Sequence, residues 1–405
     1  MANSIEHLGA LLLVAAVVAV VARKLHVPYG VGLVGTGMFL ALFSVGPDIP
    51  LTRDLIFSTL LPPLIFEAAM VLRWRELRPD LALIIALATV GLVLAAALTA
   101  AGMHWLAGWS WVAASLFGAL IAATDPVSVI ALFKEAGVRG RLRTLVESES
   151  LFNDGTAAVL FAIGAAVAAG QSVTPGLFAV WTLQSIGGGI LAGAVVAGVV
   201  LALANRTDDH LVKLSFTTIA AYGSFLLAEH FGGSGVLATL CAGLLVGNLG
   251  TASATSARAR VAIEAFWEFA AFVSNSLIFL LIGIHEEQQN FQSVWKPALI
   301  AIALVTLGRA LAVYPVCGLF ARGASPVSLR HQHLLVWGGL RGALALALAL
   351  SLPPQMAERE AIVAVSFAVV AFSIFAQGLS IAPLLRRLGQ IPPSPLPREA
   401  GQGRG

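Results

Sequence analysis

Runs of about 20 apolar residues recur along almost the whole chain, and this feature constrains the fold more than any other. The hydrocarbon core of a bilayer is about 30 Å thick, so a spanning helix needs about 20 mostly apolar residues. Charged residues make up only 11% of the 405 residues, whereas ordinary soluble proteins carry about 25%. We therefore predict an all-α polytopic protein embedded in a lipid bilayer, with no nucleic acid among its partners.

We predict thirteen membrane-spanning segments from the apolar runs and the polar stretches between them. The ninth is short and rich in glycine ("SGVLATLCAGLLVGNLG"). The predicted segments cover residues 8–22, 27–46, 54–72, 80–103, 110–133, 146–170, 176–204, 211–229, 234–250, 261–284, 297–321, 331–352 and 361–385.

The Lys and Arg residues of the loops test this count, because cytoplasmic loops of membrane proteins carry an excess of them. If the thirteen segments alternate in direction, nineteen of these residues fall on one side and only Arg53, Lys296 and Arg359 on the other. Omitting the ninth segment would scramble this bias from Arg258 onward. We therefore expect the N-terminus outside and the C-terminus in the cytoplasm. The short tail and lean loops favour a prokaryotic inner membrane.

Several charged residues lie inside the predicted segments. Arg309 and Arg341 are the two Lys or Arg residues left over from the loop count, and they lie inside the eleventh and twelfth segments. A charge at membrane depth costs several kcal/mol, so each such residue is a candidate for function or for pairing. From the helical rise, Asp125 and Asp154 lie roughly 12 Å from the inner edge and Arg341 roughly 15 Å, with Glu67 somewhat shallower. Charges at one level predict a single site.

Two of the segments carry helix-breaking residues. Asp125 in the fifth segment precedes Pro126, which removes a backbone donor and disfavours a helical conformation in the residue before it. In the twelfth segment, glycines flank Arg341 on both sides ("VWGGLRGALA"). The two segments are seven spans apart, which suits an inverted repeat of segments one to six and eight to thirteen. Paired interrupted helices in such repeats are typical of the binding sites of secondary transporters.

The sixth segment presents two adjacent polar stripes, because residues four apart share one helix face. Ser150 and Asp154 form one stripe, and Glu149 and Asn153 form the other. We expect one stripe to line a cavity and the other to tie the helix to its neighbours.

Five motifs around these residues resemble those of the NhaP-type sodium/proton antiporters, which belong to the monovalent cation:proton antiporter-1 family. They are "LPPLIFEAAM" (61–70), "ATDPVSVIALFKEAGV" (123–138), "ESESLFNDGTA" (147–157), "FWEFAAFVSNSLIFLLIG" (266–283) and "WGGLRGALA" (337–345). The motifs occur in family order, and their combination is highly specific.

The resemblance implies a homodimer with thirteen helices per chain and two crossed, interrupted helices in each. Residues 1–387 would form one antiporter unit. Its dimerisation domain would contain segments one to three and seven to ten, and its mobile core domain segments four to six and eleven to thirteen. Residues 388–405 would be a short disordered cytoplasmic tail.

The resemblance also implies a cation site. Asp154 would carry the cation or the proton, and Asn153 would mark the electroneutral branch. Asp125, Thr124 and Ser150 would supply oxygen ligands, although Asp125 has a simpler reading as a cap of the broken helix.

For the other charged residues, the role is either implied by the resemblance or left open between two alternatives. Glu67 resembles an auxiliary acidic residue of the site, and a packing role is equally open for it. Glu149 and Arg341 resemble a structural ion pair. Arg309 reads as a charge that stabilises the core, and Glu268 as part of a solvated face or of a cation funnel.

The expected activity is the electroneutral exchange of Na⁺ or Li⁺ for H⁺ by alternating access, with both ions competing for Asp154. Potassium/proton exchange on the same scaffold remains open. An intramembrane aspartyl protease could also use Asp125 and Asp154, but its Gly-x-Gly-Asp context is missing, and a channel would need a carbonyl filter that we do not find. We expect a transporter rather than an enzyme, with no cofactor and no transition metal, because Cys241 and Cys317 lie in apolar runs without metal-ligand spacing.

Overall fold

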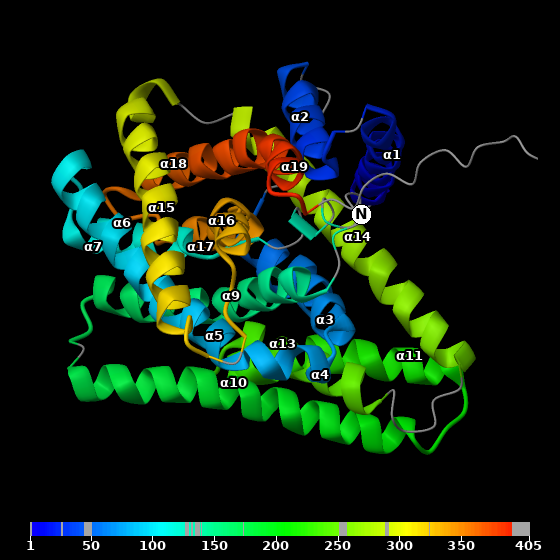
Figure 1. Cartoon of the computed structure of the whole chain (residues 1–405). Helices are drawn as coiled ribbons and strands as arrows, with labels where there is room; N and C mark the ends of the chain where they lie inside the picture. The colour runs from blue at the N-terminus through cyan, green and yellow to red at the C-terminus, as the bar shows by residue number, and fades with distance from the viewer. Residues whose placement is uncertain are drawn as a thin grey trace, which may run out of the picture.

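The computed structural model describes most of the chain (Figure 1). Within the part that it describes, every regular element is a helix. The described residues are 2–25, 27–43, 51–125, 129–130, 133, 138, 140–172, 174–250, 257–287, 291–323 and 325–390.

The helices fall on the predicted apolar segments. Most are α-helical, η2 is a short 3-10 turn, and η1, η3, η4 and η5 are π-helical turns within longer helices. The elements are α1 (Ala2–Leu25), α2 (Tyr29–Leu42), η1 (Leu55–Leu60), α3 (Leu61–Val71), α4 (Trp74–Leu77), η2 (Arg78–Asp80), α5 (Leu81–Ala86), η3 (Leu87–Gly91), α6 (Leu92–Ala107), α7 (Trp111–Ile121), α9 (Arg141–Ala168), α10 (Pro175–Ala204), α11 (His210–Thr218), η4 (Ile219–Gly223), α12 (Ser224–His230), α13 (Gly235–Leu249), α14 (Ala257–Glu287), α15 (Phe291–Leu319), α16 (Leu329–Trp337), α17 (Ala343–Leu350), α18 (Arg359–Phe372), η5 (Ser373–Gln377) and α19 (Gly378–Arg387).

Several helices extend beyond the predicted spans. The first begins at Ala2 rather than at residue 8, and α9 begins at Arg141 rather than at residue 146. The apolar run marks only the part of a helix that suits hydrocarbon, whereas the helix itself continues into polar residues. The tail predicted for 388–405 lies mostly outside the described residues, and α19 ends at Arg387.

Seven helices in the described part are long and apolar enough to cross a membrane. Their number supports a helical membrane protein, while the count of thirteen crossings stays a prediction. The seven are Trp74–Ala107, Arg141–Ala168, Gly176–Ala204, His210–His230, Ala259–His285, Val294–Leu319 and Arg359–Arg387.

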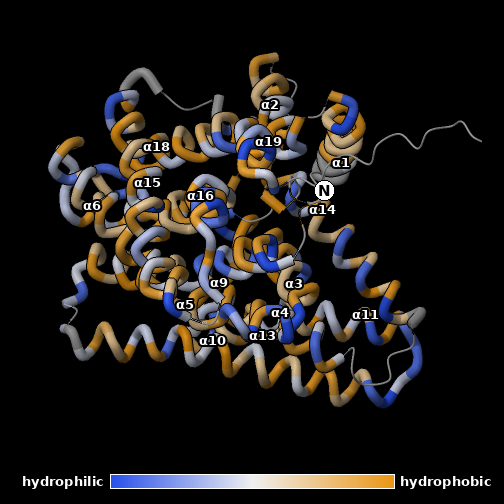
Figure 2. Tube along the Cα trace, viewed as in Figure 1, coloured by the Kyte–Doolittle hydropathy of each residue, from blue (hydrophilic) through white to orange (hydrophobic). Residues whose placement is uncertain are grey.

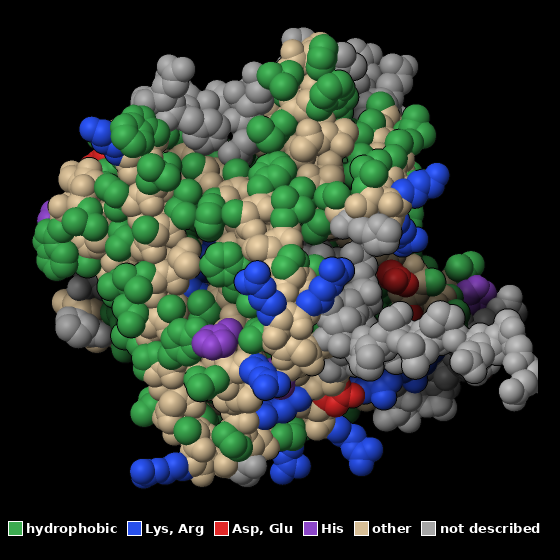
Figure 3. Space-filling model, turned by 45° about the horizontal axis from the view of Figure 1, so that its top comes forward, with side chains coloured by type: hydrophobic (Ala, Val, Ile, Leu, Met, Phe, Trp, Pro, Cys, Tyr) green, Lys and Arg blue, Asp and Glu red, His purple; other side chains and the backbone are tan. Residues whose placement is uncertain are grey.

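The surface of the protein exposes large apolar side chains, as contact with a lipid bilayer requires. Large apolar side chains such as Trp105, Leu183 and Leu319 are more than two-thirds exposed, which would be costly in water. Figure 2 shows hydrophobic residues along most of the outer helices. On the face drawn in Figure 3, most Lys and Arg side chains lie in the lower half, away from a largely apolar upper half.

The helices pack in two groups around the centre of the molecule (Figure 1). In one group α3 packs on α13 and α14, α10 packs on α13, and α2 packs on α14. In the other group α6 packs on α7 and α15, and α15 packs on α18. Helix α5 and η3 belong to this group as well, since η3 packs on α15, α6 and α5. Helix α9 touches members of both groups, so its polar stripes lie where the groups meet.

Both predicted helix breaks are confirmed. Helix α7 ends at Ile121, and residues 123–125 are not helical. Helix α16 ends at Trp337, residues 338–342 are not helical, and α17 begins at Ala343. Pro126 itself lies outside the described residues. The two interruptions leave backbone groups near the centre without helical partners, and these groups shape the site.

Candidate functional site

The two interrupted helices cross at their breaks. The backbone N–H of Asp125 donates a hydrogen bond to the carbonyl of Leu340, with 2.7 Å between N and O. Gly342 packs directly against the side chain of Asp125, because a Cβ atom at this glycine would lie only 2.6 Å from the Cβ of Asp125. The crossing therefore requires glycine in the second break and places the Asp125 side chain against it.

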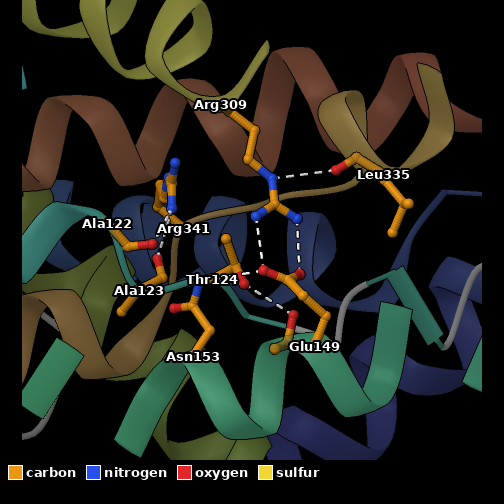
Figure 4. Close-up of polar contacts among 9 residues, drawn as sticks. Ala122, Ala123, Thr124, Glu149, Asn153, Arg309, Leu335 and Arg341 are labelled. Atoms are coloured by element: carbon orange, nitrogen blue, oxygen red, sulfur yellow. Dashed lines mark hydrogen bonds and ion pairs between the residues drawn. The ribbon is translucent and has the colours of Figure 1, made fainter. Parts of the chain in front are cut away.

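Arg341 caps the end of α7. Its Nη1 donates to the carbonyl oxygens of Ala122, at 2.7 Å, and Ala123, at 2.9 Å (Figure 4). The last carbonyls of a helix lack donors and carry partial negative charge, and a buried guanidinium satisfies both needs. Arg341 is 2% exposed. These two carbonyls are thus held by an arginine of the chain itself.

The predicted ion pair between Glu149 and Arg341 is wrong, because Glu149 pairs with Arg309 instead. Arg309 Nη1 and Nη2 each donate to one carboxylate oxygen of Glu149, both at 2.7 Å (Figure 4). The Nε of Arg309 donates to the carbonyl of Leu335, at 3.2 Å, where α16 approaches its end. The planar guanidinium matches the carboxylate in a bidentate geometry, which suits a buried pair.

Asn153 belongs to the same contact. Its Nδ2 donates to Oε1 of Glu149 at 3.2 Å, and the residue is 1% exposed. The stripe of Glu149 and Asn153 therefore ties α9 to α15, which is the role expected for one of the two polar stripes.

The stripe of Ser150 and Asp154 faces the crossing. The hydroxyls of Thr124 and Ser150 lie 2.9 Å apart and share a hydrogen bond. Asp154, Asp125 and Thr124 line one small cavity of about 40 Å³. About 10–15 Å³ is enough for one water-sized occupant, so a small ion with a partner oxygen fits. Residues of α3 and of α17 close the cavity.

One oxygen in this site stands out. Asp154 is 7% exposed, and its Oδ1 has no hydrogen-bond partner among the described residues. A buried charged oxygen without a partner is costly, so it calls for a ligand. Carboxylate and hydroxyl oxygens suit hard cations. Within the described part, no group of three His, Cys, Asp or Glu residues could hold a metal ion.

Glu67 and Glu268 lie elsewhere. Both line a second, far larger cavity of about 2270 Å³ between the two helix groups. Leu64 and Ala68 of α3 line both cavities. The structure does not place Glu67 on the small cavity, and its role as a ligand stays a prediction. Glu268 faces the large cavity, which agrees with either of its two readings.

Replacing Arg341 by Met should destabilise the protein by about 1–3 kcal/mol, because two buried carbonyls would lose their donor. Thermal unfolding of the purified protein in detergent measures the change. Arg341→Lys keeps the charge but not the planar fork, and we expect an intermediate loss. Equal melting temperatures for all three proteins would contradict the capping role.

Comparison with known proteins relates the chain to a known family. The model of the family described as "Sodium/hydrogen exchanger, transmembrane" matches residues 10–387. The chain is 39% identical over 372 residues to the Na⁺/H⁺ antiporter ApNhaP of Aphanothece halophytica, covering 90% of this chain and 70% of that protein. It is 40% identical over 379 residues to the low-affinity Na⁺/H⁺ antiporter NhaS1 of Synechocystis sp., covering 91% and 71%.

A solved structure has a similar fold. The sodium proton antiporter MjNhaP1 of Methanocaldococcus jannaschii superposes with a TM-score of 0.78, covering 96% of this chain and 98% of that one. The two sequences are 19% identical, so the likeness concerns the fold.

Proposed function

The chain belongs to the sodium/hydrogen exchanger family, and from this premise we propose that it exchanges Na⁺, and also Li⁺, for H⁺ across the membrane. The observation that carries the proposal is the buried, unpartnered Oδ1 of Asp154 beside a cavity of about 40 Å³. The names of the relatives, which are Na⁺/H⁺ antiporters, support the choice of ions.

Competition for Asp154 explains how two ions are coupled. A single buried carboxylate is neutralised either by a proton or by a monovalent cation, and each occupant excludes the other. Asp125, Thr124 and Ser150 supply further oxygen donors when the cation is bound. The empty, charged form is costly in the low dielectric of the cavity, so the site crosses the membrane mainly when loaded.

The buried charges favour an electroneutral exchange. Glu149 is already balanced by Arg309 through two hydrogen bonds of 2.7 Å. Arg341 is fixed on the carbonyls of the α7 end. In our proposal Asp125 keeps one protonation state through the cycle, so only Asp154 changes its occupant, and it carries the same net charge with a proton as with a monovalent cation. One cation therefore moves one way for each proton that moves the other way.

The large cavity supports alternating access. It separates α3, α13 and α14 from α5, η3 and part of α9, and it adjoins the small cavity at Leu64 and Ala68. In our proposal the first group belongs to a fixed dimerisation domain, within a homodimer. The second group belongs to a core domain that moves and carries the loaded site. The N-terminus lies outside and the C-terminus in the cytoplasm of a bacterial plasma membrane.

Fluorescence of a pH-sensitive dye in everted vesicles tests the activity. We expect Na⁺ and Li⁺ to dissipate an imposed proton gradient, in line with the names of the relatives, and we expect K⁺ to have a much weaker effect. In proteoliposomes, clamping the membrane voltage with valinomycin and K⁺ should leave the Na⁺-driven rate unchanged.

Two outcomes would count against the proposal. A response to K⁺ that exceeds the response to Na⁺ would assign potassium/proton exchange to the same site. A rate that depends on the clamped voltage would contradict electroneutrality. Vesicles that lack the protein provide the background in each case.

A further inference from the structure

A two-residue link joins the two helix groups. Helix α3 ends at Val71, the backbone at Leu72 and Arg73 is extended, and α4 begins at Trp74. The link runs along the rim of the large cavity, which Leu72, Arg73 and Trp74 help to line. It is one of the points where the chain passes from one group of helices to the other, since α14 and α15 also belong to different groups.

Asn248 of α13 holds the link on both of its sides. Its Oδ1 accepts a hydrogen bond from the backbone N–H of Trp74, at 2.8 Å. Its Nδ2 donates to the carbonyl of Leu72 at 2.9 Å and to the carbonyl of Leu244 in its own helix at 2.8 Å. Only an amide side chain combines the acceptor and the donors that these three contacts need.

The helix before the link is fixed to α13. Gly247 lies so close to α3 that a Cβ atom there would overlap the carbonyl of Met70. Phe66 of α3 also packs on Trp267 of α14, with ring centroids 4.6 Å apart. Contacts as close as these leave α3 no room to slide along its neighbours.

The helices after the link are fixed to α9. Leu77 is fully buried in a cluster with Leu142 and Leu145 of α9. Asp80 accepts two hydrogen bonds from Arg141 at the start of α9, at 2.7 and 2.8 Å. Arg141 also donates to the carbonyls of Ser325 and Pro326, so the segment between α15 and α16 is held at the same point.

We propose that Asn248 is the pivot of the exchange cycle, a positioning residue that fixes the link while the core domain turns about it. The inference rests on the proposed function, since a pivot matters only if the two groups move against each other. Asn248 bonds to Leu72 and to Trp74, the residues on either side of Arg73. If these bonds are lost, the core domain reaches orientations in which the cation site opens to neither side of the membrane. The hydrogen bonds that the structure gives Asn248 among the described residues go to Leu72, Trp74 and Leu244, none of which lines the small cavity.

Kinetics of Asn248→Ala provide the first test. We expect the maximal exchange rate to fall about tenfold, because domain movement limits many transport and catalytic cycles. The KM for Na⁺ should stay within about twofold, because the ligands of the cation are unchanged. Thr239→Ala is the matched control, since it removes a 3.3 Å bond from the same helix to the carbonyl of Ala221, within one helix group. It should leave both constants unchanged.

Distances between spin labels provide the second test, which does not depend on exchange. Labels replace Val90 on η3 and Val195 on α10, which are 54% and 50% exposed, in a protein whose cysteines are changed by Cys241→Ala and Cys317→Ala. We expect discrete distances in the otherwise unchanged protein and in Thr239→Ala, and a broadened distribution in Asn248→Ala.

The two tests separate the proposals. An unchanged or raised maximal rate in Asn248→Ala, or a distance distribution equal to that of Thr239→Ala, overturns the pivot. If the unchanged protein exchanges no cation at all, the proposed function fails, while the distance distributions still decide whether Asn248 restrains the two groups.

Discussion

Asp154→Asn should abolish cation/proton exchange while leaving the fold intact. Asparagine has nearly the shape of aspartate, so the packing around the small cavity is kept. It neither releases a proton nor balances the charge of a cation, so neither half of the cycle can load. The measurement is dye dequenching with Na⁺ in everted vesicles, at matched protein levels. The expected residual rate is that of vesicles without the protein.

A matched control guards against a general effect of removing a carboxylate. Asp208→Asn changes an exposed aspartate in the segment between α10 and α11, and it should exchange at the unchanged rate. The melting temperature of Asp154→Asn should equal or exceed that of the unchanged protein, since a buried group without a partner loses its charge. Normal exchange by Asp154→Asn would refute the assignment of the carrier.

Arg309→Met should destabilise the protein by about 3–5 kcal/mol, because it leaves the carboxylate of Glu149 buried and unpaired. Glu149 is 1% exposed, so water cannot readily replace the guanidinium. The carbonyl of Leu335 loses its bond to Arg309 as well. Thermal unfolding in detergent and the yield of folded, monodisperse protein measure the loss.

The double variant Glu149→Gln with Arg309→Met separates pairing from packing. Removing both charges should recover most of the stability, because neither partner is then left alone in the interior. Arg309→Lys keeps a charge but offers no planar fork, and we expect a stability between those of the single variant and the unchanged protein. A double variant as unstable as Arg309→Met would show that the ion pair is not what holds this region.

The positions of the helices and of both breaks could be predicted from the sequence. These features are local: apolar runs of about 20 residues, the pair Asp125–Pro126 and the glycines around Arg341. The sequence of each short stretch is therefore enough to predict the helix or the break in it. The nearness of Asp125 and Asp154 could be predicted as well, because helix direction and rise fix the depth of each residue, whereas Thr124 was placed there by the resemblance alone.

The pairing of the buried charges could not be predicted in the same way. Both arginines inside the predicted segments, Arg309 and Arg341, were candidate partners of Glu149, and only the three-dimensional packing decides between them. Arg341 donates to the carbonyls at the end of α7, which need a donor because the helix stops there. Arg309, on the neighbouring α15, is left to meet Glu149. The role of Asn248 was missed for a similar reason, since its partners are backbone atoms 174 and 176 residues away.

The distance along the chain between Glu149 and Arg309, 160 residues, has a consequence for biosynthesis. Ribosomes add about 5–20 residues per second, so Glu149 waits roughly 8–32 s before its arginine is made. During that interval the arginine that pairs with Glu149 in the folded protein has not yet been made. The first half of the protein should therefore stay loosely assembled, or shielded by the insertion machinery, until α15 arrives.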